Sequence, residues 1–243
     1  MGVALGLSTL GQIHLEQGKI QEAYEVFSQS LAIWRSVGDS RGTAACLRVL
    51  GESAYRLGRH DEAQRLLEES LEKNQALNYR WGTAATLATL GDAALSLGET
   101  TRAEHLIREG IALFREVGDR LNTAVALDAL GAVRHRRGMY REAQADFLEA
   151  FHLGMEMQSL SVALEALVGV AGVRVQEGSI EPVLELFMHV VNHPASNQRT
   201  KDRAEELRAG LEAQLTPQQI QAAHARAQAQ TFEAVVQEIL AMQ

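Results

Sequence analysis

The residue types that most often carry chemistry are sparse in this chain of 243 residues. Cys46 is its single cysteine and the eight histidines are scattered, so nothing is arranged for nucleophilic catalysis. The phosphate-binding pattern Gly-x-x-x-x-Gly-Lys and the zinc pattern His-Glu-x-x-His are both absent. We therefore expect a protein that is not an enzyme and that uses no cofactor.

One group of residues has the spacing of metal ligands. Glu185, His189 and His193 follow one another at four-residue intervals, which places them on one face of a helix. Neutral imidazole is a good zinc ligand. A single straight helix cannot, however, place three ligands tetrahedrally around one ion, and His193 stands where a helix end attracts a cation. We expect no metal site here.

The remaining candidates are suited to binding. Tyr and Arg are typical anchors of protein interfaces, and Arg48, Tyr55 and Arg56 fall close together on one predicted helix. Trp81, at the start of another predicted helix, is a second candidate anchor, with a partly buried packing contact as the alternative. The predicted binding residues, which are either recognition residues or neutral surface, are Arg48, Glu52, Tyr55, Arg56, Trp81, Asp92, Asp128, His135 and Arg136.

Composition narrows the class of protein that must position these residues. Apolar residues make up 46% of the chain, and no proline precedes Pro182, which favours helices over β-structure. The net charge of −8 gives no basic face, so nucleic acid is not an expected partner of this segment. The N-terminus lacks a signal-peptide pattern, and the most apolar stretch, Val162–Val173, is too short to span a bilayer. We expect a soluble, cytoplasmic protein.

Five columns of residues recur every 40 positions, which indicates an internal repeat. Each unit is predicted to form two helices, and glycines or Asn78 mark the helix ends. Glycine inside a helix costs about 0.5–1 kcal/mol relative to alanine, so the third column implies close helix packing against the alanines of the fourth. The columns are Leu7, Leu47, Leu87, Leu127 and Leu167; Gly18, Gly58, Gly98, Gly138 and Gly178; Gly11, Gly51, Gly91 and Gly131; Ala23, Ala63, Ala103 and Ala143; and Phe27, Leu67, Ile107, Phe147 and Phe187.

The pattern resembles the tetratricopeptide repeat, in which Trp-x-x-Leu-Gly-x-x-Tyr precedes Ala and Phe in the second helix. Leu47-x-x-Leu50-Gly51 matches the first part, and Ala63 with Leu67 matches the second. The family's Tyr and terminal Pro are absent, and the unit is 40 residues long instead of about 34. These long units are similar to those of bacterial signal-transduction ATPases and related transcriptional regulators. The resemblance implies an all-α fold, a right-handed α-solenoid of antiparallel helical hairpins with a C-terminal helical cap.

The predicted organisation is five repeats over residues 1–198, followed by a helical capping segment over residues 199–243. The repeats are expected at 1–40, 41–80, 81–120, 121–160 and 161–198, and the capping helices at 200–215, 217–228 and 232–241. That tail is similar to the segment that closes many of the same ATPases. The first repeat has no polar capping helix before it, as in a segment of a longer polypeptide. Side chains such as Val3, Leu7, Leu10, Ile20 and Phe27 should leave an open flank, through which we expect self-association.

Two functions remain open from the sequence. The first is a non-catalytic scaffold for a protein or peptide, serving as the sensor or interaction segment of a larger bacterial signalling regulator. The alternative is a sensor domain that encloses a small effector, a metabolite, in the superhelix. A long groove of mixed charge would favour the first, whereas a closed apolar pocket would favour the second.

Overall fold

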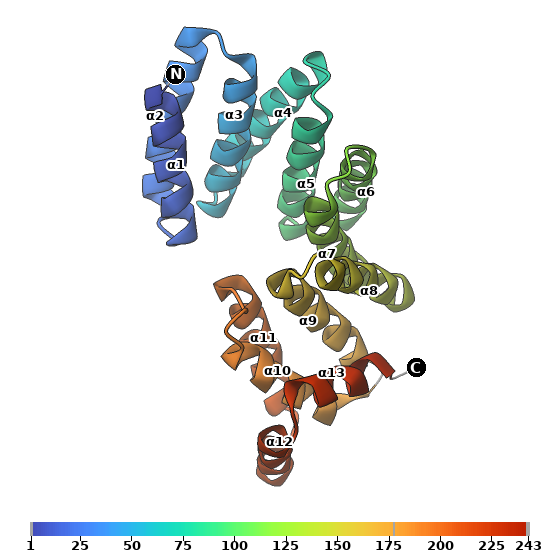
Figure 1. The fold of residues 1–243 in the computed structure, drawn as a ribbon. Helices are drawn as coiled ribbons and strands as arrows, with labels where there is room; N and C mark the ends of the chain where they lie inside the picture. Colours follow the sequence, from blue (N-terminus) through green and yellow to red (C-terminus); the bar gives the residue numbers. More distant parts are fainter. Residues whose placement is uncertain (1, 177, 242–243) are drawn as a thin grey trace. The chain divides into compact units, whose positions relative to one another are not determined.

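The computed structural model describes residues 2–176 and 178–241, and over these two ranges it consists of thirteen α-helices with no strand (Figure 1). The predicted fold class, all-α with helical hairpins, is therefore confirmed. None of the helices in these ranges is long and apolar enough to cross a membrane. The helices are α1 (Gly2–Glu16), α2 (Ile20–Val37), α3 (Ser40–Arg56), α4 (His60–Ala76), α5 (Arg80–Ser96), α6 (Thr100–Glu116), α7 (Arg120–Arg136), α8 (Tyr140–Glu156), α9 (Leu160–Gln176), α10 (Ile180–Asn192), α11 (Gln198–Glu212), α12 (Pro217–Ala229) and α13 (Phe232–Ala241).

The chain divides into two compact units, residues 1–122 and residues 123–243. In the first unit, consecutive helices pair into the hairpins α1–α2, α3–α4 and α5–α6, and each hairpin packs on the next through α2–α3 and α4–α5 contacts. In the second unit, α8 packs on α9 and α9 on α10. Helix α7 begins in the first unit and lies mostly in the second.

The helix ends fall at the predicted breaks. Each predicted glycine break adopts a positive φ, and Asn78 does the same with φ of 50°. The fourth unit, for which no break residue was predicted, ends at Gln158, which takes the left-handed conformation with φ of 55°. Glutamine has no special tolerance for this conformation, so its position in the repeat imposes it: the Ser159 N–H donates to the carbonyl of Gly154 at 2.8 Å and closes the helix.

The glycines inside the helices are sites of close approach, as predicted, but the neighbour differs from the prediction. A Cβ on Gly51 would lie 2.6 Å from Cγ of Leu67 and 3.2 Å from the carbonyl oxygen of Ala63. The alanine therefore contributes its backbone, and the large side chain four residues later fills the space over the glycine. Phe27 fills this space over Gly11, and Phe147 over Gly131.

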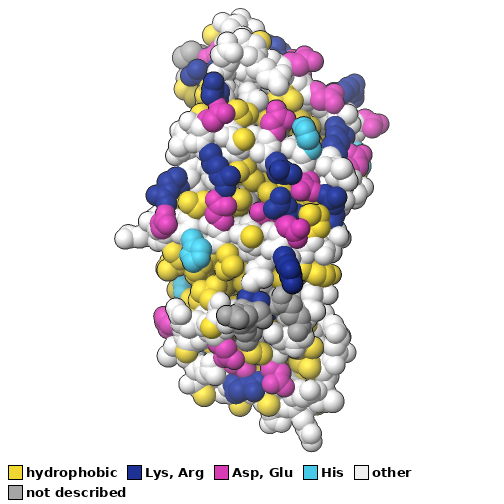
Figure 2. Space-filling model, turned by 90° about the vertical axis from the view of Figure 1, so that its right-hand side faces the viewer, with side chains coloured by type: hydrophobic (Ala, Val, Ile, Leu, Met, Phe, Trp, Pro, Cys, Tyr) yellow, Lys and Arg dark blue, Asp and Glu magenta, His cyan; other side chains and the backbone are white. Residues whose placement is uncertain are grey.

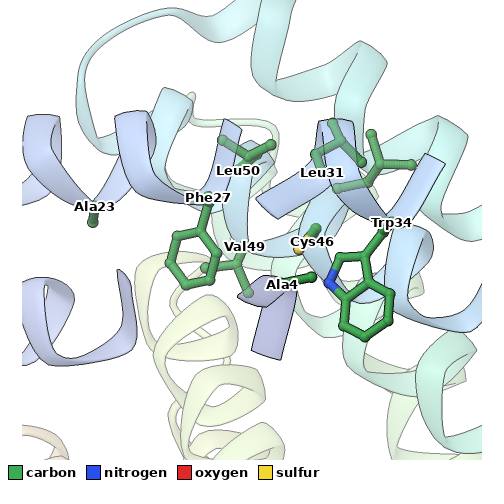
Figure 3. Packing of buried hydrophobic residues seen from close by; sticks show 9 residues of the cluster. Ala4, Ala23, Phe27, Leu31, Trp34, Cys46, Val49 and Leu50 are labelled. Atoms are coloured by element: carbon green, nitrogen blue, oxygen red, sulfur yellow. The ribbon is translucent and has the colours of Figure 1, made fainter. Parts of the chain in front are cut away.

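The core of the first two hairpins lies between α2 and α3 (Figure 3). The rings of Phe27 and Trp34 flank Ala4, Cys46 and Val49, and each of these side chains is buried. Phe27 is only 3% exposed, so the expectation that it belongs to an open flank is wrong. Val3 and Leu10, which were expected on the same flank, are indeed open to solvent, at 69% and 42% exposed.

The C-terminal helices pack on the last hairpin of the second unit. Helix α11 contacts α10 and α9, α12 contacts α10, and α13 contacts α10 and α9. Thr216 caps α12, because its hydroxyl accepts from the Gln219 N–H while the Gln219 side chain accepts from the Thr216 N–H. Helix α13 has the predicted bounds, whereas α11 starts two residues earlier than predicted and ends three residues earlier.

Candidate functional site

A groove of about 440 Å³ opens in the first unit between α1, α3 and α5, and it is called the first-unit groove below. Two of the predicted binding residues, Arg48 and Trp81, lie in its wall. The full lining is Leu5, Ser8, Gln12, Phe27, Trp34, Asp39, Arg41, Gly42, Ala45, Cys46, Arg48, Val49, Tyr79 and Trp81.

The polar groups on the floor of this groove are satisfied within the protein. The Ser30 hydroxyl donates to the Ala4 carbonyl at 2.8 Å and lies 2.9 Å from the Ser8 hydroxyl. The buried Cys46 thiol lies 3.5 Å from the Ser30 hydroxyl. In the next hairpin, Ser70 repeats this arrangement by donating to the Ala44 carbonyl at 2.8 Å. Because this bond recurs with the repeat, the floor is a structural feature of the helix packing.

Arg48 is one of three charged residues of the lining, together with Asp39 and Arg41. Its side chain is 25% exposed, and its guanidinium is 4.0 Å from the carboxylate of Glu52, one turn along α3. Burial lowers the pKa of Arg48, and the charge of Glu52 offsets that effect only in part. Glu52 and water compensate the charge of the Arg48 guanidinium only in part. A second carboxylate in hydrogen-bonding distance would therefore stabilise this charge.

Aromatic side chains stand at one end of the groove. The Arg41 guanidinium lies over the Tyr79 ring, 4.3 Å from its centroid, in cation–π geometry. Tyr79 and Trp81 have ring centroids 6.1 Å apart. The Trp81 indole N–H donates to the Asp119 carboxylate at 2.7 Å, so this side chain makes the partly buried contact between repeats while its ring lines the groove. Burial raises the pKa of Asp119, but hydrogen bonds from Asn122 and Trp81 outweigh burial and lower it.

The other predicted residues of the first unit lie outside the groove lining. Glu52 stands between two arginines, because Arg56 also approaches it at 4.0 Å. The Tyr55 ring faces His60 at the α3–α4 turn, with centroids 5.2 Å apart. Asp92 lies exposed on α5.

The three predicted residues of the second unit have different environments. Asp128 is only 5% exposed and pairs with Arg203 of α11 at 3.0 Å. Burial raises the pKa of Asp128, and the charge of Arg203 opposes that shift. The His135 ring nitrogen Nε2 is 3.3 Å from the Gly172 carbonyl oxygen, and its ring packs edge-on against Tyr140. Arg136 is exposed.

Several residues around these sites were missed in the sequence. Arg41 stands 40 residues before Trp81, so the repeat itself places both at the mouth of the groove. Tyr79, which directly follows the left-handed Asn78, was not predicted to bind. The partners of Asp128 and Glu165, which are Arg203 and Arg199, lie in the tail and share no repeat spacing with them.

The residues with metal-ligand spacing have other partners. The Glu185 carboxylate pairs with the Arg226 guanidinium at 2.6 Å. The rings of His189 and His193 lie against Phe232, with centroid distances of 6.2 and 5.0 Å. Within residues 2–176 and 178–241, no group of three His, Cys, Asp or Glu side chains could hold a metal ion.

Charges of both signs are interspersed over the face that Figure 2 presents, with no continuous basic area on it. A basic stripe is the usual electrostatic feature of a nucleic-acid interface. Hydrophobic side chains gather next to a histidine elsewhere on the same face.

Comparisons with known proteins agree with this architecture. Among solved structures, BtubC (BKLC) from P. vanneervenii is 17% identical with a TM-score of 0.61, covering 87% of this chain and 81% of that one. A putative kinesin light chain with nearly identical TPR-like repeats from P. anserina is 16% identical with a TM-score of 0.57, covering 86% of this chain and 94% of that one. A Rap protein complexed with Competence and Sporulation Factor is 16% identical with a TM-score of 0.63, covering 98% of this chain and 64% of that one.

At these identities the structural likeness concerns the fold alone. A search of curated protein sequences finds no match. The model of the tetratricopeptide repeat family, in contrast, matches residues 2–76 and 82–152, which is more than half of the chain. The chain therefore belongs to the tetratricopeptide repeat family.

Proposed function

We propose that this chain is a non-catalytic scaffold that binds a protein or peptide in the first-unit groove, and that the bound segment carries a carboxylate. The observation that carries the proposal is Arg48, whose side chain lies in the groove wall, is 25% exposed and makes an ion pair with Glu52 that is 4.0 Å long. A carboxylate that enters the groove completes the compensation of this charge by a charge-assisted hydrogen bond.

The surroundings of Arg48 favour an apolar or aromatic residue beside that carboxylate. Phe27 and Trp34 add apolar rings to the groove lining, and Tyr79 with Trp81 gives it an aromatic edge. Tyr, Trp and Arg are the residues in which interface binding energy is concentrated. The groove thus suits a short segment with one acidic residue next to a large apolar one.

The wider role that we propose is the sensor or interaction segment of a larger bacterial signalling regulator. The support is the similarity of the 40-residue units and of the tail to those of such regulators, and the likeness of fold to a Rap protein that was solved with a factor bound. The full coding sequence tests this role. A nucleotide-binding or DNA-binding module in the same polypeptide supports it, and a polypeptide built of repeats alone contradicts it.

The binding experiment replaces one arginine of α3 by a neutral residue and uses a second arginine of the same helix as the matched control. Arg48 and Arg56 both approach Glu52 at 4.0 Å, but only Arg48 lines the groove. A random twelve-residue peptide library on phage is selected against the wild-type chain. The recovered peptides are then measured by calorimetry with the wild type, with Arg48→Gln and with Arg56→Gln.

We expect the selected peptides to share an acidic residue beside an aromatic or apolar one. Arg48→Gln should weaken their binding by about tenfold or more, whereas Arg56→Gln should leave it nearly unchanged. Recovery of basic peptides, or equal losses in the two variants, contradicts the proposal. Thermal unfolding of both variants shows that a loss of binding is not a loss of fold.

The alternative function, a sensor of a small effector, is favoured by a separate observation. The second unit contains an apolar cavity of about 480 Å³ between α8, α9 and α13. Volumes of about 300–1,000 Å³ with mostly apolar walls are typical of small-molecule sites.

A further inference from the structure

The cavity between α8, α9 and α13, called the α13 cavity below, is built from one apolar stripe on each helix. Helix α9 contributes Leu160, Ala163, Leu164 and Leu167, which recur at helical spacing on one face. Helix α8 contributes Phe151 and Met155. All of these residues belong to the second unit, so the cavity is independent of the first-unit groove.

Helix α13 carries two apolar stripes with different roles. Val235 and Ile239 are fully buried, and the helix packs on α10 and α9. Phe232, Val236 and Leu240, spaced four residues apart, form the second stripe and line the cavity. A capping helix needs the first stripe alone to cover the end of the hairpin stack. The second stripe is a row of large side chains, one on each turn of the helix. It faces a space that the protein does not fill.

The polar groups of the cavity indicate what else a ligand must carry. The His193 Nδ1 atom accepts a hydrogen bond from the Ala195 N–H at 3.1 Å, so neutral His193 carries its proton on Nε2. That N–H has no hydrogen-bond partner among the described residues. The His193 ring lies 5.0 Å from Phe232, at the cavity wall. The half-buried His193 thus offers one N–H donor at the cavity wall, and an oxygen acceptor on the ligand would complete its hydrogen bonding.

The charges at the cavity argue for a neutral ligand. Glu233 lies among the lining residues, and its carboxylate would repel an anionic group. The other polar lining side chains are His152 and Gln237. Met155 and Leu160, which are 48% and 47% exposed, leave the cavity open to solvent at the α8–α9 turn.

We propose that the α13 cavity binds a small neutral molecule with an apolar body and one carbonyl or hydroxyl oxygen, which accepts a hydrogen bond from His193 Nε2. The apolar body packs on the stripes of α8, α9 and α13, and the occupied cavity stabilises α13 against the hairpin. This site lies in the second unit, so its occupancy is measured separately from peptide binding at Arg48.

The first test uses the fluorescent probe N-phenyl-1-naphthylamine, which is neutral and apolar, with the full chain. We expect saturable binding at one site with enhanced fluorescence. Leu240→Trp, which fills the cavity from α13, should weaken the binding by about tenfold or more. Val117→Trp adds the same ring at a position that is 41% exposed in the first unit, and it should leave the binding unchanged.

The second test separates the donor from the apolar wall. 2-Nonanone and nonane compete with the probe, and we expect the ketone to displace it at about fivefold lower concentration because it accepts the His193 hydrogen bond. His193→Phe keeps an aromatic ring beside Phe232 but removes the N–H. This variant should abolish the difference between ketone and alkane while the probe itself still binds.

The outcomes decide the proposal. An absence of saturable probe binding, or equal binding by the wild type and Leu240→Trp, overturns it. Where Leu240→Trp fails to unfold cooperatively, Met155→Glu at the exposed mouth replaces it, and unchanged probe binding in that variant also overturns the proposal. Sedimentation identifies a competing occupant: a dimer that Met155→Glu dissociates means that a second copy of the chain covers the cavity, which contradicts a small-molecule site.

Discussion

Arg203 and Asp128 are 75 residues apart in the sequence, yet the guanidinium of one lies 3.0 Å from the carboxylate of the other. The Asp128 side chain is 7% exposed and that of Arg203 is 26% exposed, so the pair is largely shielded from solvent. A second pair beside it, Arg199 with Glu165 at 3.0 Å, also joins α11 to the hairpins of the second unit. Helix α11 is therefore held to the repeats by charge as well as by packing on α10.

The first prediction concerns this pair. Arg203→Leu should lower the free energy of unfolding by about 3 kcal/mol, because it leaves Asp128 as a buried charge without its partner. The double variant Asp128→Leu/Arg203→Leu should lose less than the single variant, since no unpaired charge remains. Urea unfolding measures both, and hydrogen exchange should show α11 opening first in Arg203→Leu.

An exposed pair in the first unit is the control. Arg35 and Glu69 approach at 2.9 Å, but their side chains are 51% and 37% exposed. Arg35→Leu should cost less than about 1 kcal/mol. If Arg203→Leu costs no more than this control, the buried pair does not hold α11.

The second prediction concerns the glycines inside the helices. A Cβ on Gly91 would overlap Cγ1 of Ile107 and lie 3.4 Å from the Ala103 carbonyl oxygen. Gly91→Leu should therefore destabilise the first unit by about 1–3 kcal/mol, because α5 and α6 must move apart. Gly210 is also inside a helix but has no neighbour within 4 Å, so Gly210→Ala should stabilise α11 by about 0.5–1 kcal/mol. Thermal melts that match for Gly91→Leu and the wild type would falsify the close-approach explanation.

The sequence was sufficient to predict where the helices begin and end, but not which side chains surround them. Repeated glycines and Asn78 predict helix ends because a left-handed residue is needed at each one, and this requirement is local. Gln158 was not predicted, since its conformation is imposed by the repeat and not by its own chemistry. The partners of the glycine column were only half predicted, because spacing shows which positions are small but not which side chain covers them.

The predicted binding residues divide for a similar reason. Arg48 and Trp81 reach the first-unit groove, and one column of the repeat could have added Arg41. Asp128 was predicted to bind a partner, but its carboxylate is held in an ion pair with Arg203 in the tail. Such a contact crosses 75 residues and leaves no periodic signal. The α13 cavity was invisible for the same reason, since it requires the tail to be placed on the repeats.

The third prediction concerns pH. Burial lowers the pKa of His135, and the charge of Arg203 lowers it further, while the Gly172 carbonyl acts in the opposite direction. Because the pKa is lower in the folded state, the native chain binds fewer protons than the unfolded chain near the ordinary pKa of about 6.5. The stability that neutral His135 contributes is therefore present above that pH and is lost as the pH falls toward the lowered value.

The difference between two variants isolates this contribution. Urea unfolding at pH 7.5 and at pH 5.5 should show that the wild type loses more stability on acidification than His135→Gln, by an amount on the order of 1 kcal/mol. His105→Gln, at an exposed position on α6, is the matched histidine substitution outside this contact. Equal pH dependence in the wild type and His135→Gln would show that His135 is not the titrating group.

The fourth prediction concerns the exposed face of α1. Val3, Leu10 and Ile13 lie on one side of α1 and are between 42% and 69% exposed, and apolar areas of this kind are seldom left open on soluble monomers. We expect the chain to self-associate through this face as its concentration rises. Sedimentation velocity should show the association in the wild type and its absence in Val3→Lys/Leu10→Lys, whose new charges repel a second copy.

Hydrogen exchange on a dilute sample tests the same face without association. Among the described residues of α1, only Ala4 and Gly11 are buried. Helix α5, in contrast, has nine buried residues. Burial of apolar surface contributes roughly 25 cal/mol per Å², so the α1–α2 hairpin should open at a lower free energy than α5–α6. Fast exchange is therefore expected in α1 and slow exchange in α5.

At concentrations where the chain associates, the exchange of α1 should slow while that of α5 stays the same. If α1 is as protected as α5 in a monomer, the exposed face is stable by itself, and an association through it loses its physical basis.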